Sequence, residues 1–136
     1  TIQLPLYNEM YVADRLIESV SRIEYPRELL EIQVLDDSTD ETRKIAEQSV
    51  RRIAADGIDI KYLHRSDRTG YKAGALEAGL KVARGEFVAI FDADFLPTED
   101  FLTRLMPHFA DPKVGYIHAH NAKPGCFSCR IDRGPA

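Results

Sequence analysis

The stretch from residue 87 to residue 94, FVAIFDAD, constrains the fold of this chain more than any other. Five apolar residues, 87–91, precede two acids that one small residue separates. This apolar run is too short for a helix and is rich in aromatic and β-branched residues, which predicts a buried strand. Asp92 and Asp94 would then lie at the carboxyl end of the strand, where open α/β sheets bind their ligands.

The two acids of this stretch indicate a metal site. Asp92 and Asp94 point to the same side if the backbone stays extended, and carboxylates held close together repel each other unless a cation lies nearby. Mg²⁺ and Mn²⁺ prefer such oxygen ligands and often share them with a substrate phosphate. Acids after a strand are also common as solvated turn residues or helix caps, so the spacing alone leaves both interpretations open.

The composition is that of a single globular domain. The chain has 136 residues, of which 44% are hydrophobic and 29% charged, and its net charge is −4. No basic block offsets the acidic balance, which argues against a nucleic-acid partner. No apolar run reaches transmembrane length and no signal peptide opens the chain, so we expect this piece to be soluble. Because Thr1 lies almost inside a strand pattern, we expect a fragment of a longer protein, whose other parts could include membrane spans.

Strand patterns alternate with helix patterns through most of the chain. This alternation predicts an α/β fold with a mainly parallel sheet flanked by helices, incomplete at its carboxyl terminus. The predicted strands are 2–6, 30–35, 59–64, 87–91 and 114–118, and the predicted helices are about 12–23, 39–55, 73–84 and 98–106.

The turn after the first predicted strand lacks the G-x-G-x-x-G of dinucleotide-binding folds. Tyr7 and Glu9 occupy it instead, and Asn8 can cap the helix that follows. Tyr7 could stack on a base, and Glu9 could accept hydrogen bonds from a base or a ribose. Equally, Tyr7 can be a half-buried ring and Glu9 an acid favoured by the helix dipole.

A second acid pair, Asp36 and Asp37, follows the second predicted strand. One of these carboxylates could accept the N–H of a pyrimidine ring. The alternative is a turn acid beside a capping box formed by Ser38 and Glu41. Since a second acid pair at a second strand end is hard to attribute to chance, we favour a binding role.

A polar loop with several cations precedes the third predicted helix. Lys72 lies at the start of that helix, where it can meet a phosphate beside the helix N-terminus. The alternative is a solvated surface lysine. Arg65 and Arg68, from the same loop, are weaker candidates.

Together, four motifs resemble the family 2 glycosyltransferases with the GT-A fold. They are LPLYNE at 4–9, VLDDSTD at 34–40, DRTGYKAGAL at 67–76 and FDADF at 91–95. Within that family, the chain looks most similar to the cellulose synthase-like and mannan synthase-like β-glycan synthases. The resemblance covers about residues 1–118, which we expect to be the donor-binding part of the domain. It implies a nucleoside-diphosphate-sugar donor of UDP or GDP type, a glycan or lipid acceptor, and inversion at the transferred sugar.

The resemblance also implies site residues and a cofactor. Asp92 and Asp94 match the family's D-x-D motif and would hold Mg or Mn, with Asp94 the closer ligand. The parent protein would lie on the cytoplasmic face of a membrane. The donor would contact residues from all four motifs: Tyr7, Glu9, Asp37 or less favourably Asp36, Lys72 and Asp92.

The departures from the family concern the carboxyl-terminal part. No T-E-D-type motif, which carries the general base in the family, and no Q-x-x-R-W motif follows residue 114. We therefore expect this piece to bind donor weakly without turnover. A non-catalytic fragment that binds nucleotide or a partner subunit, and a Mg-dependent nucleotidyl- or phosphoryl-transfer domain, are the alternatives. Residues 119–136 do not resemble the family, and we expect them to be an atypical, poorly ordered tail.

The tail and the residue before it contain residue types that bind zinc. They are His118, His120, Cys126 and Cys129, and the two cysteines form a C-x-x-C half-site. The His-x-His spacing is unusual for a structural zinc site, so this reading is the less favoured one.

Overall fold

The computed structural model describes residues 1–120 and 127–134. Its strands are β1 (Ile2–Leu6), β2 (Ile32–Asp36), β3 (Ile60–His64), β4 (Phe87–Phe91), β5 (Tyr116–His120) and β6 (Phe127–Arg133). Its α-helices are α1 (Ala13–Ser21), α2 (Thr42–Ala55), α3 (Tyr71–Leu80) and α4 (Phe101–Leu105), with 3₁₀ turns η1 (Arg27–Leu29) and η2 (Met106–Ala110). Each predicted strand is confirmed, with its ends within two residues of the predicted ones.

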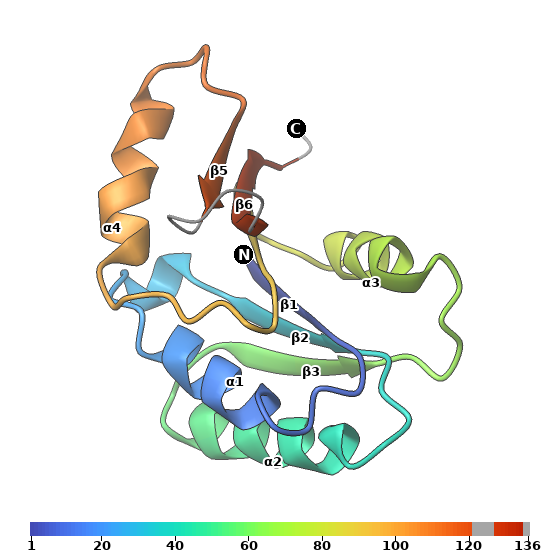
Figure 1. Ribbon diagram of the computed structural model, residues 1–136. Helices are drawn as coiled ribbons and strands as arrows, with labels where there is room; N and C mark the ends of the chain where they lie inside the picture. Colours follow the sequence, from blue (N-terminus) through green and yellow to red (C-terminus); the bar gives the residue numbers. More distant parts are fainter. Residues whose placement is uncertain (121–126, 135–136) are drawn as a thin grey trace.

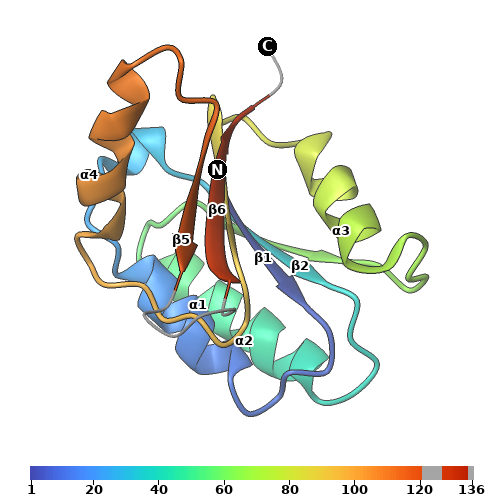
Figure 2. The ribbon, with the colours of Figure 1, turned by 45° about the horizontal axis from the view of Figure 1, so that its top comes forward.

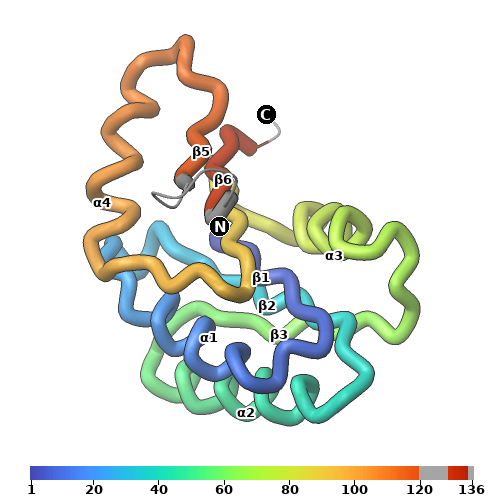
Figure 3. Tube along the Cα trace, in the orientation of Figure 1, coloured from blue at the N-terminus to red at the C-terminus, as the bar shows by residue number. Residues whose placement is uncertain are grey.

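The six strands form one sheet in the order β3-β2-β1-β4-β6-β5. The first four in that order are parallel to one another, whereas β6 is antiparallel to both β4 and β5. The prediction of a mainly parallel α/β sheet is therefore confirmed. Because the parallel strands share one direction, the loops after β1, β2 and β3 lie at the same end of the sheet (Figure 3).

Helices cover both faces of the sheet. α1 and α2 lie side by side on one face, and α3 lies on the other (Figures 1 and 2). Because successive side chains of a strand point to opposite faces of the sheet, neighbouring residues of β1 meet different helices. Ile2 and Leu4 enter the core beneath α1, while Gln3 between them contacts α3. Apolar residues at helical spacing complete this core, among them Leu16, Ile17, Val20, Val50 and Ile53.

Two predicted helix caps are absent, because their side chains connect two loops instead. Asn8 has φ 52° and lies five residues before α1 begins. Its Oδ1 accepts from the Thr39 backbone N at 2.9 Å, and its own backbone N donates to Ser38 Oγ at 2.8 Å. Ser38 thus binds the loop after β1 rather than capping α2, which begins at Thr42. Neither Asn8, which could have capped α1, nor Ser38, whose capping box was the less favoured interpretation, therefore caps a helix.

Part of the segment expected to be poorly ordered is a strand. Residues 127–133 form β6, which lies between β4 and β5 (Figure 2). Cys129 and Ile131 alternate with polar residues along it and are 0% and 1% exposed, so the strand contributes to the core. Within the described part of the chain, none of the helices has the length and apolar character that crossing a membrane requires.

Candidate functional site

A cavity of about 530 Å³ opens at the carboxyl ends of the parallel strands. It lies where β1, β2 and β4 end and α3 begins. Its lining includes most of the residues that the sequence singles out: Tyr7, Glu9, Asp37, Lys72, Asp92 and Asp94, together with Pro5, Leu6, Leu35, Arg68, Ala75 and Ala93. Residues from four separate motifs thus meet in one place, as expected for loops at one edge of a parallel sheet.

One acid of the cavity contacts the lysine at the start of α3. Lys72 Nζ donates to Asp92 Oδ1. The Asp92 side chain is 25% exposed and that of Lys72 is 50% exposed, so the pair lies at the mouth of the cavity rather than in its floor. Asp94 follows two residues later and is exposed. One cation of the protein therefore already neutralises part of the acidic charge at this end.

Asp92 and Asp94 suit a divalent cation that is shared with a ligand. In the described residues there is no group of three or more His, Cys, Asp or Glu side chains that could hold a metal by itself. Mg²⁺ and Mn²⁺ are commonly held by one or two carboxylates, with phosphate oxygens and water as the other ligands. Two accessible carboxylates beside an open cavity fit that type of site.

Asp37 is held by an arginine. Arg65 Nε donates to Asp37 Oδ1 at 2.9 Å and its Nη2 donates to Oδ2 at 2.6 Å. These hydrogen bonds raise the pKa of Arg65 above its ordinary value. The same guanidinium donates to the carbonyls of Thr69 and Tyr71, each at 3.1 Å. Arg65, a weaker candidate from the sequence, is thus the residue that joins Asp37 to the loop before α3.

Asp36 lies outside the cavity, contrary to its place among the predicted donor contacts. It is 0% exposed, and both of its carboxylate oxygens have partners inside the protein. The Ser38 backbone N donates to Oδ1 at 2.9 Å, and Tyr62 Oη donates to Oδ2 at 2.6 Å. Burial, and next the hydrogen bond to Asp36, raise the pKa of Tyr62. Asp36 ends β2, where neighbouring positions face opposite ways, so only Asp37 reaches the cavity.

Tyr7 and Arg68 form a stacked pair at the rim of the cavity. The guanidinium carbon of Arg68 lies 3.4 Å from the centre of the Tyr7 ring and 5.1 Å from the centre of the Tyr71 ring. Tyr7 is 40% exposed, so its ring remains partly accessible at the site although Arg68 stacks on it. Arg68 was a weaker candidate from the sequence, because its position in a loop with several cations does not reveal that it packs on Tyr7.

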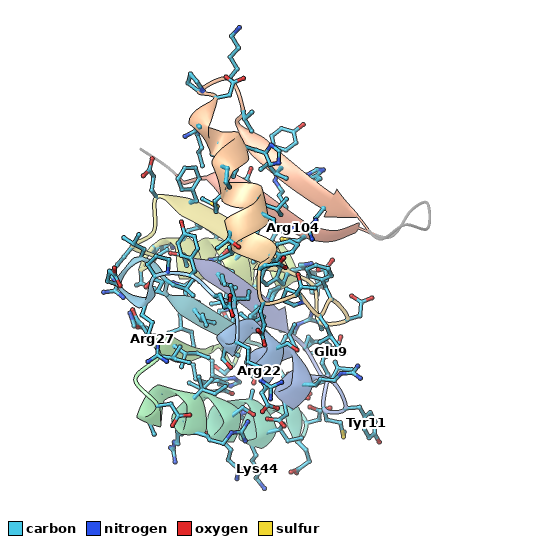
Figure 4. The ribbon with its side chains drawn as sticks, turned by 90° about the vertical axis from the view of Figure 1, so that its left-hand side faces the viewer. Glu9, Tyr11, Arg22, Arg27, Lys44 and Arg104 are labelled. Atoms are coloured by element: carbon cyan, nitrogen blue, oxygen red, sulfur yellow. The ribbon has the colours of Figure 1, made fainter. Side chains whose placement is uncertain are left out.

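Glu9 joins the cavity to α1. Its backbone carbonyl accepts from Val12 N at 3.1 Å and Ala13 N at 2.9 Å, which starts the helix, while the residue lines the cavity. In Figure 4, Glu9 and Tyr11 lie at the end of the sheet opposite to Arg27. Arg27 lines a separate cavity of about 540 Å³ at the amino ends of the strands, which contains none of the predicted site residues.

The hypothesis of a zinc site finds no support in the described residues. On the paired strands β5 and β6, His118 lies opposite Arg130 and Ala119 lies opposite Cys129, so His118 and Cys129 are on different faces of the sheet. Cys129 is buried, and burial raises the pKa of its thiol, which disfavours the thiolate that zinc binds. Cys126 and the side chain of His120 lie outside the described residues.

Three comparisons relate the chain to known proteins. The family model "Glycosyl transferase family 2" matches residues 1–127. Glucomannan 4-beta-mannosyltransferase 9 of Arabidopsis thaliana is 45% identical over 87% of this chain and 23% of its own length. Glucomannan 4-beta-mannosyltransferase 1 of Cyamopsis tetragonoloba is 43% identical over 97% of this chain and 26% of its own. The chain therefore spans about a quarter of the length of these relatives.

Solved structures share the fold. The mannosyltransferase PcManGT from Pyrobaculum calidifontis, in complex with GDP-Man and Mn²⁺, superposes with a TM-score of 0.82 and is 28% identical over 97% of this chain and 43% of that chain. S. aureus TarS 1–349, in complex with UDP-GlcNAc, gives a TM-score of 0.74 at 24% identity, covering 91% of this chain and 35% of that chain. At that identity, the second likeness concerns the fold alone.

Proposed function

The chain belongs to glycosyl transferase family 2, and from this premise we propose that it is the donor-binding part of an inverting glycosyltransferase. The complete enzyme would transfer a hexose from a nucleoside-diphosphate sugar to a glycan or lipid acceptor. One observation carries the proposal: the lining of the cavity at the carboxyl ends of β1, β2 and β4 combines an acid pair and a lysine with Tyr7 and Asp37.

The acid pair and the lysine would receive the diphosphate. Asp92 and Asp94 would hold a divalent cation, Mg or Mn, which supplies positive charge to the leaving diphosphate when it is bound. Lys72 Nζ, which donates to Asp92 in the structure, would donate to a diphosphate oxygen instead. Because negative charge grows on the leaving group as the glycosidic bond breaks, these contacts strengthen towards the transition state.

The nucleoside would occupy the Tyr7 and Asp37 end. Tyr7 offers a ring face for a base, and Glu9 offers carboxylate oxygens for ribose hydroxyls or base N–H groups. Asp37 would accept an N–H group of the base while Arg65 holds its carboxylate in place. The resemblance left both a UDP and a GDP donor open.

The relatives favour a particular donor and setting. Two plant relatives at 43% and 45% identity are named as glucomannan mannosyltransferases, and PcManGT was solved with GDP-Man and Mn²⁺. GDP-mannose is therefore the donor that we propose, with a β-mannan or glucomannan chain as acceptor. We further propose that the complete protein lies on the cytoplasmic face of a membrane, held by segments outside this chain.

Calorimetric titration tests the proposal. GDP, GDP-mannose, UDP and UDP-glucose would each be added to the chain with and without Mn²⁺. We expect GDP and GDP-mannose to bind with Mn²⁺, and the metal dependence to disappear in Asp94→Ala. Glu99→Ala removes an equal charge from an exposed position outside the cavity and serves as the control. Equal affinities with and without Mn²⁺, in a chain shown to be folded, would overturn the metal assignment.

A further inference from the structure

Two buried glutamines connect the sheet to α3. Gln3 of β1 and Gln33 of β2 lie opposite each other in the parallel register and are 0% and 1% exposed. Gln3 Nε2 donates to Gln33 Oε1 at 3.0 Å. Both side chains face α3, which lies on the side of the sheet opposite to α1 and α2 (Figure 1). Amide side chains in such a buried place require partners, and the backbone of α3 provides them.

The pair binds α3 through two carbonyls. Gln3 Nε2 also donates to the Leu76 carbonyl at 3.2 Å, and Gln33 Nε2 donates to the Gly79 carbonyl at 3.0 Å. Gly79 makes this approach possible, because a Cβ at that position would lie 2.6 Å from Gln3 Nε2 and 2.7 Å from Gln33 Oε1. The glycine and both amides therefore fit only as a set.

Little apolar packing holds α3 in place. Ala75 and Gly79 are its only buried residues, and both are small. The amide oxygen of Gln3 is buried without a hydrogen-bond partner among the described residues, which costs free energy. Two aliphatic residues would remove that cost. What the glutamines provide and aliphatic residues cannot is direction, since a hydrogen bond fixes a carbonyl at one distance and angle.

The face of α3 that the two glutamines contact is also the face that carries Lys72. Positions 72, 75 or 76, and 79 follow the helical spacing i, i+3 or i+4, i+7, so they lie in one line along the helix. Lys72 and Ala75 line the cavity, and Gly79 sits on the glutamines. A rotation or shift of α3 would thus move Lys72 away from Asp92.

We propose that Gln3 and Gln33 are positioning residues for Lys72. By fixing the rotation and height of α3, they place the lysine ammonium where a diphosphate would meet the acid pair. This inference rests on the proposed function, in which Lys72 contacts the diphosphate of the donor. It assigns a role in phosphate binding to two side chains that do not line the cavity.

A double-mutant cycle tests this role on the chain itself. The variants are Gln33→Leu, Lys72→Met and the double variant, and the probes are GDP and guanosine with Mn²⁺. We expect each single substitution to weaken GDP binding by about tenfold, since a hydrogen bond to a charged group is lost or misplaced. The double variant should bind GDP no more weakly than Lys72→Met alone. Guanosine, which has no phosphate, should bind all four chains equally, whereas a general loss of structure would weaken its binding too.

A second variant tests the contact between the glutamines and α3 by a substitution on the helix. Gly79→Ala places a methyl group against both amides, while Gly115→Ala is the matched control, since nothing lies within 4 Å of its Cβ position. We expect Gly79→Ala to weaken GDP binding but not guanosine binding, and Gly115→Ala to change neither. UDP and uridine serve as the same pair of probes if the chain prefers uridine.

The outcomes separate the two proposals. If Lys72→Met weakens GDP binding but Gln33→Leu adds its own full effect in the double variant, the positioning role is overturned and the proposed function stands. If Lys72→Met leaves GDP affinity unchanged, the proposed contact between Lys72 and the diphosphate is wrong, and the positioning role falls with it.

Discussion

Arg65 donates hydrogen bonds to both carboxylate oxygens of Asp37, with Nε 2.9 Å from Oδ1 and Nη2 2.6 Å from Oδ2. The Asp37 side chain is 4% exposed and that of Arg65 is 20% exposed, so this is a largely desolvated pair with fork geometry. Arg65 also donates hydrogen bonds to the carbonyls of Thr69 and Tyr71, and these bonds hold the loop before α3 in place. The end of β2 and the loop that leads to Lys72 therefore form one unit.

Removing Arg65 should destabilise the fold. Arg65→Met leaves the Asp37 carboxylate buried without its partner, and we expect the free energy of unfolding to fall by about 2–4 kcal/mol. Urea denaturation measures this. Arg51→Met breaks an exposed pair with Glu47 at 2.9 Å and should change stability by less than ~0.5 kcal/mol. Equal losses of stability in the two variants would show that the Arg65–Asp37 pair stabilises the fold no more than an exposed pair does.

The two neighbouring acids should behave differently on substitution. Asp36→Asn disturbs the buried bond from Tyr62 and should lower the melting temperature while nucleotide affinity stays unchanged in the folded protein. Asp37→Asn should weaken nucleotide binding by about tenfold, because it alters a side chain that lines the cavity. Thermal melting and calorimetry on both variants give the comparison. A loss of nucleotide affinity in folded Asp36→Asn would mean that Asp36 takes part in nucleotide binding after all.

Glu31 should make stability depend on acid pH. Burial alone would raise the pKa of Glu31, but hydrogen bonds from Thr1 and Arg84 and the charge of Arg84 lower it from 4.5 to about 2. A lowered folded-state pKa means that the stabilisation is present above the unfolded value and is lost as the pH falls from about 4.5 towards 2. Glu31→Gln should therefore be less stable than the parent chain at pH 6, and the difference should shrink by pH 2.5. Urea denaturation at several pH values checks this, and a difference that is constant with pH would contradict it.

The ring of Tyr7 should matter more than its hydroxyl. If a base stacks on this ring, Tyr7→Ala should weaken nucleotide binding by about 1–3 kcal/mol, whereas Tyr7→Phe keeps the ring face and should bind nearly as well. Calorimetry with GDP, guanosine and inorganic diphosphate locates the effect, which should appear for the first two ligands only. An equal loss for diphosphate would place Tyr7 at the phosphate end instead.

The chain should bind donor without transferring the sugar. The resemblance places the general base downstream of the motifs found here, and activation of an acceptor hydroxyl needs such a base. With GDP-mannose, Mn²⁺ and manno-oligosaccharides, we expect no elongated product under conditions in which calorimetry shows saturation. Chromatography of the oligosaccharides is the measurement, and elongation that depends on Asp94 would show that a base is present after all.

Much of the fold was accessible from the sequence because its signals are local. Apolar runs and helical spacing predicted the strands and helices, and the position of polar residues after strands predicted which of them meet. The cavity contains Tyr7, Asp37, Lys72, Asp92 and Asp94 as the motifs led us to expect. Their roles towards a donor remain proposals.

The sequence by itself determined the order of strands and helices and the edge of the sheet at which the polar motifs gather, since both follow from the periodicity of short segments. Only the tertiary structure decided that Asp37 rather than Asp36 lines the cavity, and that Asn8 and Ser38 join two loops instead of capping helices. It likewise decided that β6 enters the sheet and that Gln3 and Gln33 hold α3. These features depend on the direction of single side chains and on partners about 30 or more residues away, which no local pattern encodes.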